Sequence, residues 1–143
     1  MSFLTSLDIS KNALSAQRLR MDIIAQNIAN AETTRTTDGT PYKRKLVVFE
    51  EKLSFKNILG EKQGRYRFDG VAVTSVVEDP SPLKPVYDPS HPDANEDGYV
   101  MMPNVDRAEE TIDLMAATRS YDANVIVLNA VKSMAQSALS IGK

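Results

Sequence analysis

The residues best suited to chemistry form an acidic loop that ends in glycine. Asp93, Asn95 and Asp97 place side-chain oxygens at alternate positions and Gly98 follows, as in the first half of a calcium-binding loop. The twelfth position, however, is Asn104 rather than a glutamate that could bind the ion with two oxygens. A proline also precedes the loop where a helix would have to arrive. The sequence therefore favours a polar turn and predicts no metal or cofactor.

The single histidine of the chain is the next candidate. His91 lies beside Ser90 and Asp93, which together have the residue types of a catalytic triad. Triads are assembled from positions that the fold brings together, whereas these three residues share one proline-rich loop. We therefore predict a solvated loop histidine and no enzymatic activity.

Composition narrows the remaining classes of function. With 17 basic and 19 acidic residues, the chain lacks the basic excess typical of nucleic-acid-binding proteins. The run Lys43-Arg44-Lys45 could contact phosphate or an acidic partner, but two glutamates follow it and a solvated strand start is favoured. No apolar run approaches the roughly 20 residues that cross a bilayer, so we predict no membrane insertion. The absence of cysteine excludes disulfides and thiolate metal sites.

Two long helices are predicted, one at each end of the chain, and they would position the loop residues described above. Residues 3–31 repeat an apolar residue every seven positions, and a second row widens the surface enough for more than one packing partner. The main row consists of Leu7, Leu14, Met21 and Ile28, and the second row of Ile9, Ala16, Leu19 and Ile23. At about 1.5 Å per residue, a helix of this length is a rod-like element of roughly 40 Å.

The C-terminal helix, predicted for residues 108–141, has the spacing of a coiled-coil seam. Apolar side chains alternate in steps of three and four. The seam consists of Leu114, Ala117, Tyr121, Asn124, Leu128, Val131, Ala135 and Ala138. Asp106 is the predicted N-cap, and Glu109 and Glu110 fall in the first turn, where the helix dipole favours acidic side chains.

Three asparagines interrupt or end these stripes. Asn124 lies within the apolar seam, where an amide either fixes the register of a helix pair or rotates outward to solvent; the spacing fits both. Asn27 precedes Ile28 of the N-terminal stripe and is a candidate for a bond to a neighbouring chain. Asn30 is predicted to end the first helix in the left-handed conformation.

The middle of the chain, residues 36–104, matches neither end. It holds most of the prolines, with strands predicted at 45–49, 70–77 and 98–103 and extended connectors at 79–82 and 85–92. The predicted fold is mainly α with a small β element. Residues 1–35 and 105–143 would form one helical core domain, paired as an antiparallel coiled coil. Residues 36–104 would form an extended, Pro/Gly-rich region that contains the strands.

Several motifs resemble the bacterial flagellar rod and hook family. The N-terminal signature of that family is similar to Ser10-x-x-Ala13-Leu14 followed by residues 25–33. Four further blocks resemble the short proximal-rod members of that family. They are residues 86–94, 98–105, 119–125 and 132–134. Residues 36–41 intervene before Tyr42, where most rod and hook proteins place Gly-Tyr-Lys close to the threonine.

This resemblance implies a structural subunit of the flagellar basal-body rod, which carries torque from the motor to the hook. Its implied partners are other rod proteins, further copies of the chain and the flagellar type III export apparatus, with the surrounding basal-body rings as a candidate contact. Such export would place the subunit in the periplasmic part of the basal body without a cleaved signal peptide. The N-terminus, which lacks a basic leader and a cleavage site, agrees with that route.

The helical stripes would then form the assembly interface. The predicted interface residues are Leu7, Leu14, Met21, Asn27, Ile28, Asn30, Leu114, Tyr121, Asn124, Leu128 and Val131. The isolated chain would leave part of these stripes uncovered. The alternative is a soluble helical hairpin that acts as a binding or adaptor module and presents the middle region to a ligand.

Overall fold

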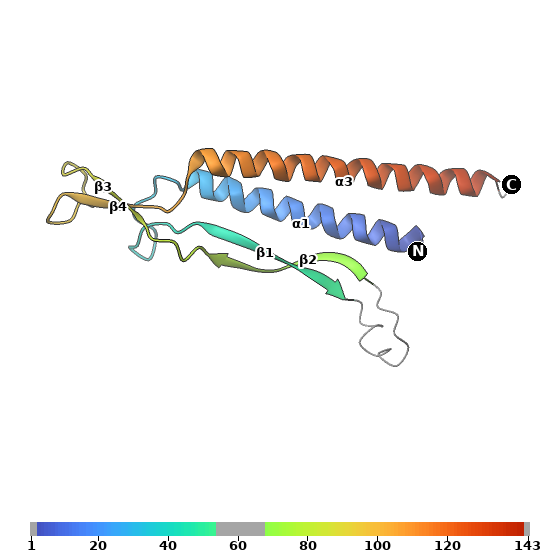
Figure 1. Ribbon diagram of the computed structural model, residues 1–143, viewed down its shortest axis with the longest axis horizontal. Coiled ribbons are helices and arrows are strands. Elements are labelled where there is room, and N and C mark those ends of the chain that lie inside the picture. The colour runs from blue at the N-terminus through green and yellow to red at the C-terminus, as the bar shows by residue number, and fades with distance from the viewer. Residues whose placement is uncertain (1–2, 54–67, 142–143) are drawn as a thin grey trace. The chain divides into compact units, whose positions relative to one another are not determined.

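The computed structural model describes residues 3–53 and 68–141 (Figure 1). The elements in chain order are α1 (Phe3–Ala29), β1 (Lys45–Leu53), β2 (Phe68–Glu78), β3 (Lys84–Tyr87), β4 (Tyr99–Met102) and α3 (Arg107–Ile141). The helices contain 27 and 35 residues, and the strands form two separate two-stranded sheets. The predicted class, mainly helical with a small β element, is confirmed at this level.

Helix α1 ends through side-chain bonding rather than through a left-handed residue. The amide nitrogen Nδ2 of Asn30 donates to the carbonyl of Gln26 at 2.9 Å, and Thr33 Oγ1 donates to Asn30 Oδ1 at 3.2 Å. Among the described residues, positive φ angles occur only at glycines. The prediction of a left-handed Asn30 is therefore wrong. In the last turn the carbonyls of Gln26, Asn27 and Ile28 also accept from the backbone nitrogens of Asn30 and Ala31, so the helix ends without an αL residue.

Helix α3 begins where the sequence predicts. The Asp106 carboxylate oxygen Oδ1 accepts from the backbone nitrogens of Ala108 at 2.9 Å and Glu109 at 3.4 Å, which confirms Asp106 as the N-cap. The hydrogen bonds from Ala108 and Glu109 lower the pKa of Asp106 because they favour its charged form. Lys84 Nζ, 3.9 Å from Oδ2, adds to this effect.

The chain divides into two compact units, each of which takes part of both helices. The terminal unit contains residues 1–20, 48–75 and 117–143, and the hairpin unit contains residues 21–47 and 76–116. Each unit also includes parts of β1 and β2, which pair with each other.

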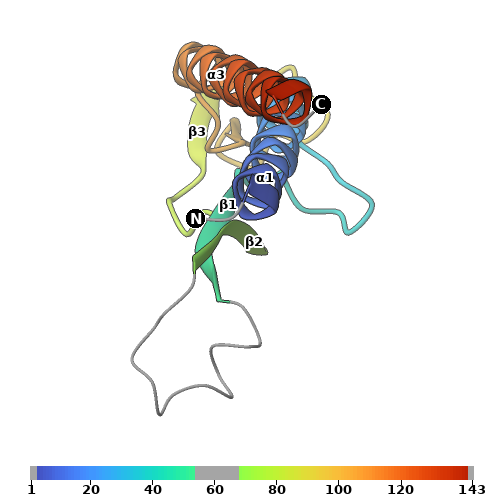
Figure 2. The same ribbon diagram turned by 90° about the vertical axis from the view of Figure 1, so that its right-hand side faces the viewer.

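In the terminal unit, α1 lies between α3 and the β1–β2 ribbon (Figures 1 and 2). Ile9 of α1 contacts Gly70 of β2 closely: a Cβ at Gly70 would stand 3.3 Å from the Ile9 Cα atom. Gly70 also has a φ of +97°, which disfavours any side chain there. On the side of α3, Ala117 and Val131 are buried. The second apolar row, which contains Ile9, therefore has a partner within the chain.

In the hairpin unit, β3 and β4 form an antiparallel ribbon. Val86 pairs with Val100 and Tyr87 with Tyr99, and Val100 is buried. The predicted connector at 85–92 is thus wrong in its first part, because Pro85 lies within β3. A proline is tolerated there since a two-stranded ribbon leaves one side of each strand unpaired. The strands predicted at 45–49, 70–77 and 98–103 are confirmed as β1, β2 and β4.

Candidate assembly site

Asn27 lies at the centre of a buried polar cluster in the hairpin unit. Its side chain is 1% exposed. Nδ2 donates to the carbonyl of Lys45 at 2.9 Å and to Glu110 Oε2 at 3.0 Å. Oδ1 accepts from the Tyr42 hydroxyl at 2.9 Å and from the backbone nitrogen of Lys45 at 3.0 Å. Two donors and two acceptors are the full capacity of an amide, so Asn27 is satisfied within its own chain.

Glu110 connects this amide to Arg44. The Glu110 side chain is 1% exposed, and its oxygen Oε1 accepts from Arg44 Nε. The Arg44 side chain is 16% exposed and also lies 3.7 Å from Asp79 and 3.5 Å from Asp113. A buried carboxylate with a hydrogen-bonded guanidinium costs far less than one left alone. We call Asn27, Tyr42, Arg44 and Glu110 the Asn27 cluster.

The backbone of Arg44 is also hydrogen-bonded to other segments of the hairpin unit. Arg44 N donates to Asn104 Oδ1 at 2.7 Å, and the carbonyl of Arg44 accepts from Asp79 N at 2.8 Å. Asn104 Nδ2 in turn donates to the carbonyls of Asp79 and Ser81. The start of β1, the end of β2 and the segment before α3 are thereby joined at one point.

The surroundings of the cluster change the acidity of its members. Burial raises the pKa of the Tyr42 hydroxyl, and the charges of Glu110 and Glu78 raise it further. Burial alone would lower the pKa of Arg44, but the hydrogen bond and charge of Glu110 raise it overall. The pKa of Asp79 is lowered, first by the hydrogen bonds from Ser81 and then by Arg44. The three shifts favour a neutral Tyr42 hydroxyl, a charged Arg44 guanidinium and a charged Asp79 carboxylate.

Sequence reasoning misjudged Arg44 and overlooked its partners. The interpretation of residues 43–45 as a solvated strand start holds for the exposed Lys43 but is wrong for Arg44. Glu110 was expected only as a first-turn acid of the helix. The one local signal is a tyrosine directly before three basic residues, and it does not reveal a carboxylate 66 positions away.

The predicted interface residues are mostly half-covered by the chain itself. Val131 is buried, as is Asn27. Intermediate exposure is found at Leu7, Leu14, Met21, Ile28, Asn30, Leu114, Tyr121, Asn124 and Leu128. On α3 these are the seam positions, so the spacing of three and four identifies the more protected side of that helix.

The side-chain amide of Asn124 forms a hydrogen bond within its own helix. Its nitrogen Nδ2 donates to the carbonyl of Ser120 at 2.9 Å, four residues earlier. The side chain is half-buried within the seam row. The amide therefore lies in the seam while bonding along the helix, an arrangement between the two alternatives that the sequence left open.

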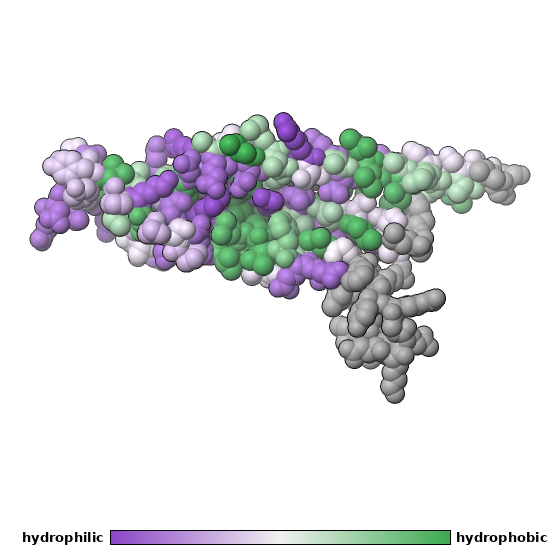
Figure 3. All heavy atoms as spheres, viewed as in Figure 1, coloured by the Kyte–Doolittle hydropathy of each residue, from purple (hydrophilic) through white to green (hydrophobic). Residues whose placement is uncertain are grey.

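Helix α3 also exposes large apolar side chains outside its seam. Ile112, Ile126 and Met134 are 62%, 68% and 63% exposed, and Met115 and Val127 are exposed as well. Hydrophobic side chains are visible along α3 in Figure 3. A helix that is apolar on more than one side is normally covered on more than one side.

The acidic loop forms the predicted polar turn. Asn95 Oδ1 accepts from the backbone nitrogens of Asp97 and Tyr99, and Gly98 has a φ of +79°. His91 Nδ1 accepts from Asp93 N within the same loop. Within residues 3–53 and 68–141, no group of three histidine, cysteine or acidic side chains is arranged to hold a metal ion. Neither helix, over its described length, is apolar enough to cross a membrane.

Comparisons with known proteins match both ends of the chain to flagellar rod families. Residues 7–35 match the family model "Flagella basal body rod protein", and residues 96–141 match "Flagellar basal body rod FlgEFG protein C-terminal". The "Flagellar basal-body rod protein FlgC" of Bacillus subtilis is 46% identical, over 96% of this chain and 97% of the relative. Those of Borreliella burgdorferi and Salmonella typhimurium are 42% and 43% identical, over at least 98% of each chain.

The chain belongs to the FlgC family of flagellar basal-body rod proteins. The identities of 46% and 43% extend over at least 96% of each chain. A FlgC-family chain is a structural subunit of the rod rather than an enzyme, and it assembles with other components of the basal body. The adaptor alternative is not supported.

Proposed function

We propose that this subunit belongs to the proximal rod and joins other rod proteins and further copies of itself into the shaft that transmits motor torque. The observation that carries the proposal is α3. Its seam side packs within the chain, whereas Ile112, Ile126 and Met134 remain more than half exposed. Large apolar side chains exposed on more than one side of a helix indicate a protein contact.

Coiled-coil packing of the helices with those of neighbouring subunits is the form of contact that we propose. Leu7, Leu14, Leu114 and Leu128 keep intermediate exposure in the single chain. Neighbouring helices would cover both these half-open seam positions and the outer side of α3, which removes apolar area at about 25 cal/mol per Å². The relatives' rod names and the helical spacing support this mode.

Delivery through the flagellar type III export apparatus and residence in the periplasmic part of the basal body complete the proposal, with the surrounding rings as a further contact. Their support is the family membership. The alternating seam, rather than a membrane anchor, would hold the subunit in place.

The test replaces the gene in its own bacterium with variants. Ile126→Asp places a charge in the exposed apolar side of α3, whereas Asn129→Asp places the same charge at an exposed polar position of that helix. We expect Ile126→Asp to abolish swimming and leave basal bodies without complete rods, because a carboxylate would have to be buried at the contact. Asn129→Asp should swim normally.

Both variants should give the same circular dichroism spectrum as the wild-type chain, since neither side chain is buried in it. Complete rods in the Ile126→Asp strain would contradict the proposed contact. Complete rods in a strain lacking the gene would contradict the proposed function itself.

A further inference from the structure

The β3–β4 ribbon presents an aromatic face that the described part of the chain leaves exposed. Tyr87 lies opposite Tyr99 and Pro85 lies opposite Met101, so these four side chains share one face. The tyrosine rings contact edge to face with centroids 5.3 Å apart, and Tyr87 is 65% exposed. Val100, which points to the other face, is buried. Exposed paired tyrosines are typical of protein contacts because one ring edge is apolar and the hydroxyl is polar.

A hollow beside this face could accept a side chain of a partner. It has a volume of about 350 Å³ and is lined by Arg35, Pro41, Leu83, Asp93 and Met101, among others. Arg35 and Asp93 lie 3.8 Å apart and largely neutralise each other. The hollow is therefore mostly an apolar extension of the aromatic face.

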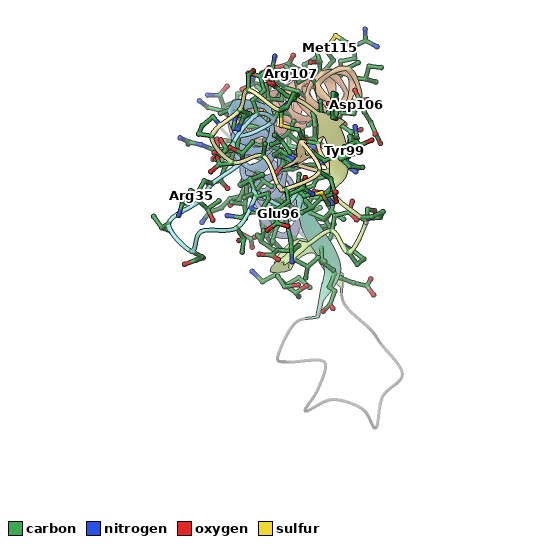
Figure 4. All side chains as sticks on the ribbon, turned by 90° about the vertical axis from the view of Figure 1, so that its left-hand side faces the viewer. Arg35, Glu96, Tyr99, Asp106, Arg107 and Met115 are labelled. Atoms are coloured by element: carbon green, nitrogen blue, oxygen red, sulfur yellow. The ribbon has the colours of Figure 1, made fainter. Side chains whose placement is uncertain are left out.

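The loop between β3 and β4 adds negative charge at the edge of that face. Residues 88–98 contain four acidic side chains and no lysine or arginine. Two of them are engaged locally: Asp88 accepts from Ser90, and Asp93 accepts from Thr34. Glu96 and Asp97 are exposed and, among the described residues, have no ion-pair partner. Glu96 and Tyr99 are labelled in Figure 4, which views the hairpin unit from this side.

Residues 52–67 have the complementary chemistry. Residues 52–67 carry five basic side chains against a single glutamate, interspersed with apolar and aromatic residues. The basic members are Lys52, Lys56, Lys62, Arg65 and Arg67. Arginine and lysine side chains bind both to carboxylates and to aromatic faces.

We propose that the acidic, aromatic tip of the β3–β4 ribbon binds the basic segment 52–67 of a second copy of this chain. This inference rests on the proposed self-association. The contact joins two different parts of the chain, the tip of one copy and the basic segment of the next. Such a heterologous contact extends into a ring or a helical array rather than stopping at a dimer. Charge complementarity sets the order and register of the copies.

Paired cysteines test the contact inside the assembled rod, because the natural chain contains none. Two single variants, Glu96→Cys and Arg65→Cys, are expressed together in the bacterium that lacks the native gene. After mild oxidation, isolated basal bodies should contain a disulfide-linked species of twice the chain mass. The matched control pairs Arg65→Cys with Asp38→Cys, another exposed acid of the hairpin unit, and should not form that species.

Several results would overturn the proposal. One is that the Glu96→Cys and Arg65→Cys chains both enter basal bodies but form no more disulfide-linked species than the Asp38→Cys and Arg65→Cys control pair. Another is a double variant, Glu96→Cys with Arg65→Cys in one chain, that links only within itself. A photoreactive residue at position 96 that captures a different rod subunit would also overturn it. Absence of the wild-type chain from basal bodies would overturn the proposed function as well, which distinguishes the two failures.

Charge reversal gives a second measurement that does not depend on cysteine chemistry. Glu96→Lys with Asp97→Lys should lower incorporation into rods about tenfold, because like charges would meet at the contact. Adding Lys62→Glu and Arg65→Glu to the same chain should restore it. Glu96 and Asp97 lie outside the Asn27 cluster. Failure of the second pair to restore incorporation would contradict the pairing.

Discussion

The hairpin unit and the terminal unit use the same long helix, α3, in opposite ways. In the hairpin unit, Glu110 of α3 is 1% exposed and both of its oxygens are bonded to residues of the same chain. In the terminal unit, Ile126 and Met134 of α3 project into solvent. The first region is complete by itself and defines how the chain folds on itself. The second region is incomplete and acquires its cover from neighbours.

The difference follows from the physical chemistry of the two kinds of side chain. A buried carboxylate loses water on all sides, so each lone pair must find a donor at a fixed distance and angle. Here Asn27 of α1 and Arg44, directly before β1, supply those donors from within the same chain. An exposed apolar side chain requires no such geometry, and any complementary surface that excludes water stabilises it. Exposed apolar side chains can therefore serve assembly contacts without determining how the single chain folds.

The largest effect is expected from Arg44→Ala. This change leaves the buried carboxylate of Glu110 without its cation, which should lower the free energy of unfolding by about 3–5 kcal/mol. Denaturant titration of the purified chain measures it, and Lys43→Ala, at an exposed neighbour, serves as the matched control. An Arg44→Ala chain as stable as the control would show that the hairpin unit is not held by its polar cluster.

The second prediction concerns alkaline pH. Because the pKa of Tyr42 is raised in the fold, the unfolded chain loses this proton first as pH rises above about 10. The stability that Tyr42 contributes is therefore present below that pH and lost above it. Tyr42→Phe should cost about 1 kcal/mol at neutral pH, through the lost bond to Asn27, and should lessen the alkaline decline. Equal alkaline slopes in both proteins would contradict the assignment.

The terminal unit is tested with Met134→Ser. Since Met134 is 63% exposed, the free energy of unfolding of the isolated chain should change by no more than about 0.5 kcal/mol. Incorporation into rods, measured as the amount of chain in purified basal bodies, should nevertheless fall. Gln136→Ser, a neighbouring exposed polar position, should change neither quantity. The prediction would be contradicted if Met134→Ser destabilised the isolated chain but left its incorporation into rods unchanged.

The smallest effect is expected from Asn124→Ala. The amide of Asn124 bonds to Ser120 within its own helix, and alanine is the better helix former, so stability should change by only a few tenths of a kcal/mol. Swimming should persist. Loss of swimming with unchanged stability would show that Asn124 acts across to a neighbouring helix, which would sharpen the division between the two units.

The long elements were predictable because their signals are local and repeated. Periodicity located both helices to within two residues at their ends, and Asp106 identified the start of α3 because an N-cap bonds only two or three residues ahead. Strand β3 was missed since its evidence lies in its partner β4, 15 or so positions away. Asn30 was misassigned because its side chain, rather than its φ angle, completes the helix end.

By itself, the sequence determined two long helices, their seams, the strands with clear alternation and membership of the rod family. Each of these is a property of neighbouring residues or of a repeated motif. The tertiary structure alone decided that Arg44 is half-buried beside Glu110, that Asn27 is satisfied within its own chain and that α3 exposes Ile126 and Met134. The first two outcomes depend on residues 15 to 83 positions apart meeting at hydrogen-bonding distance. No local pattern encodes that distance; only the folded packing of the whole chain fixes it.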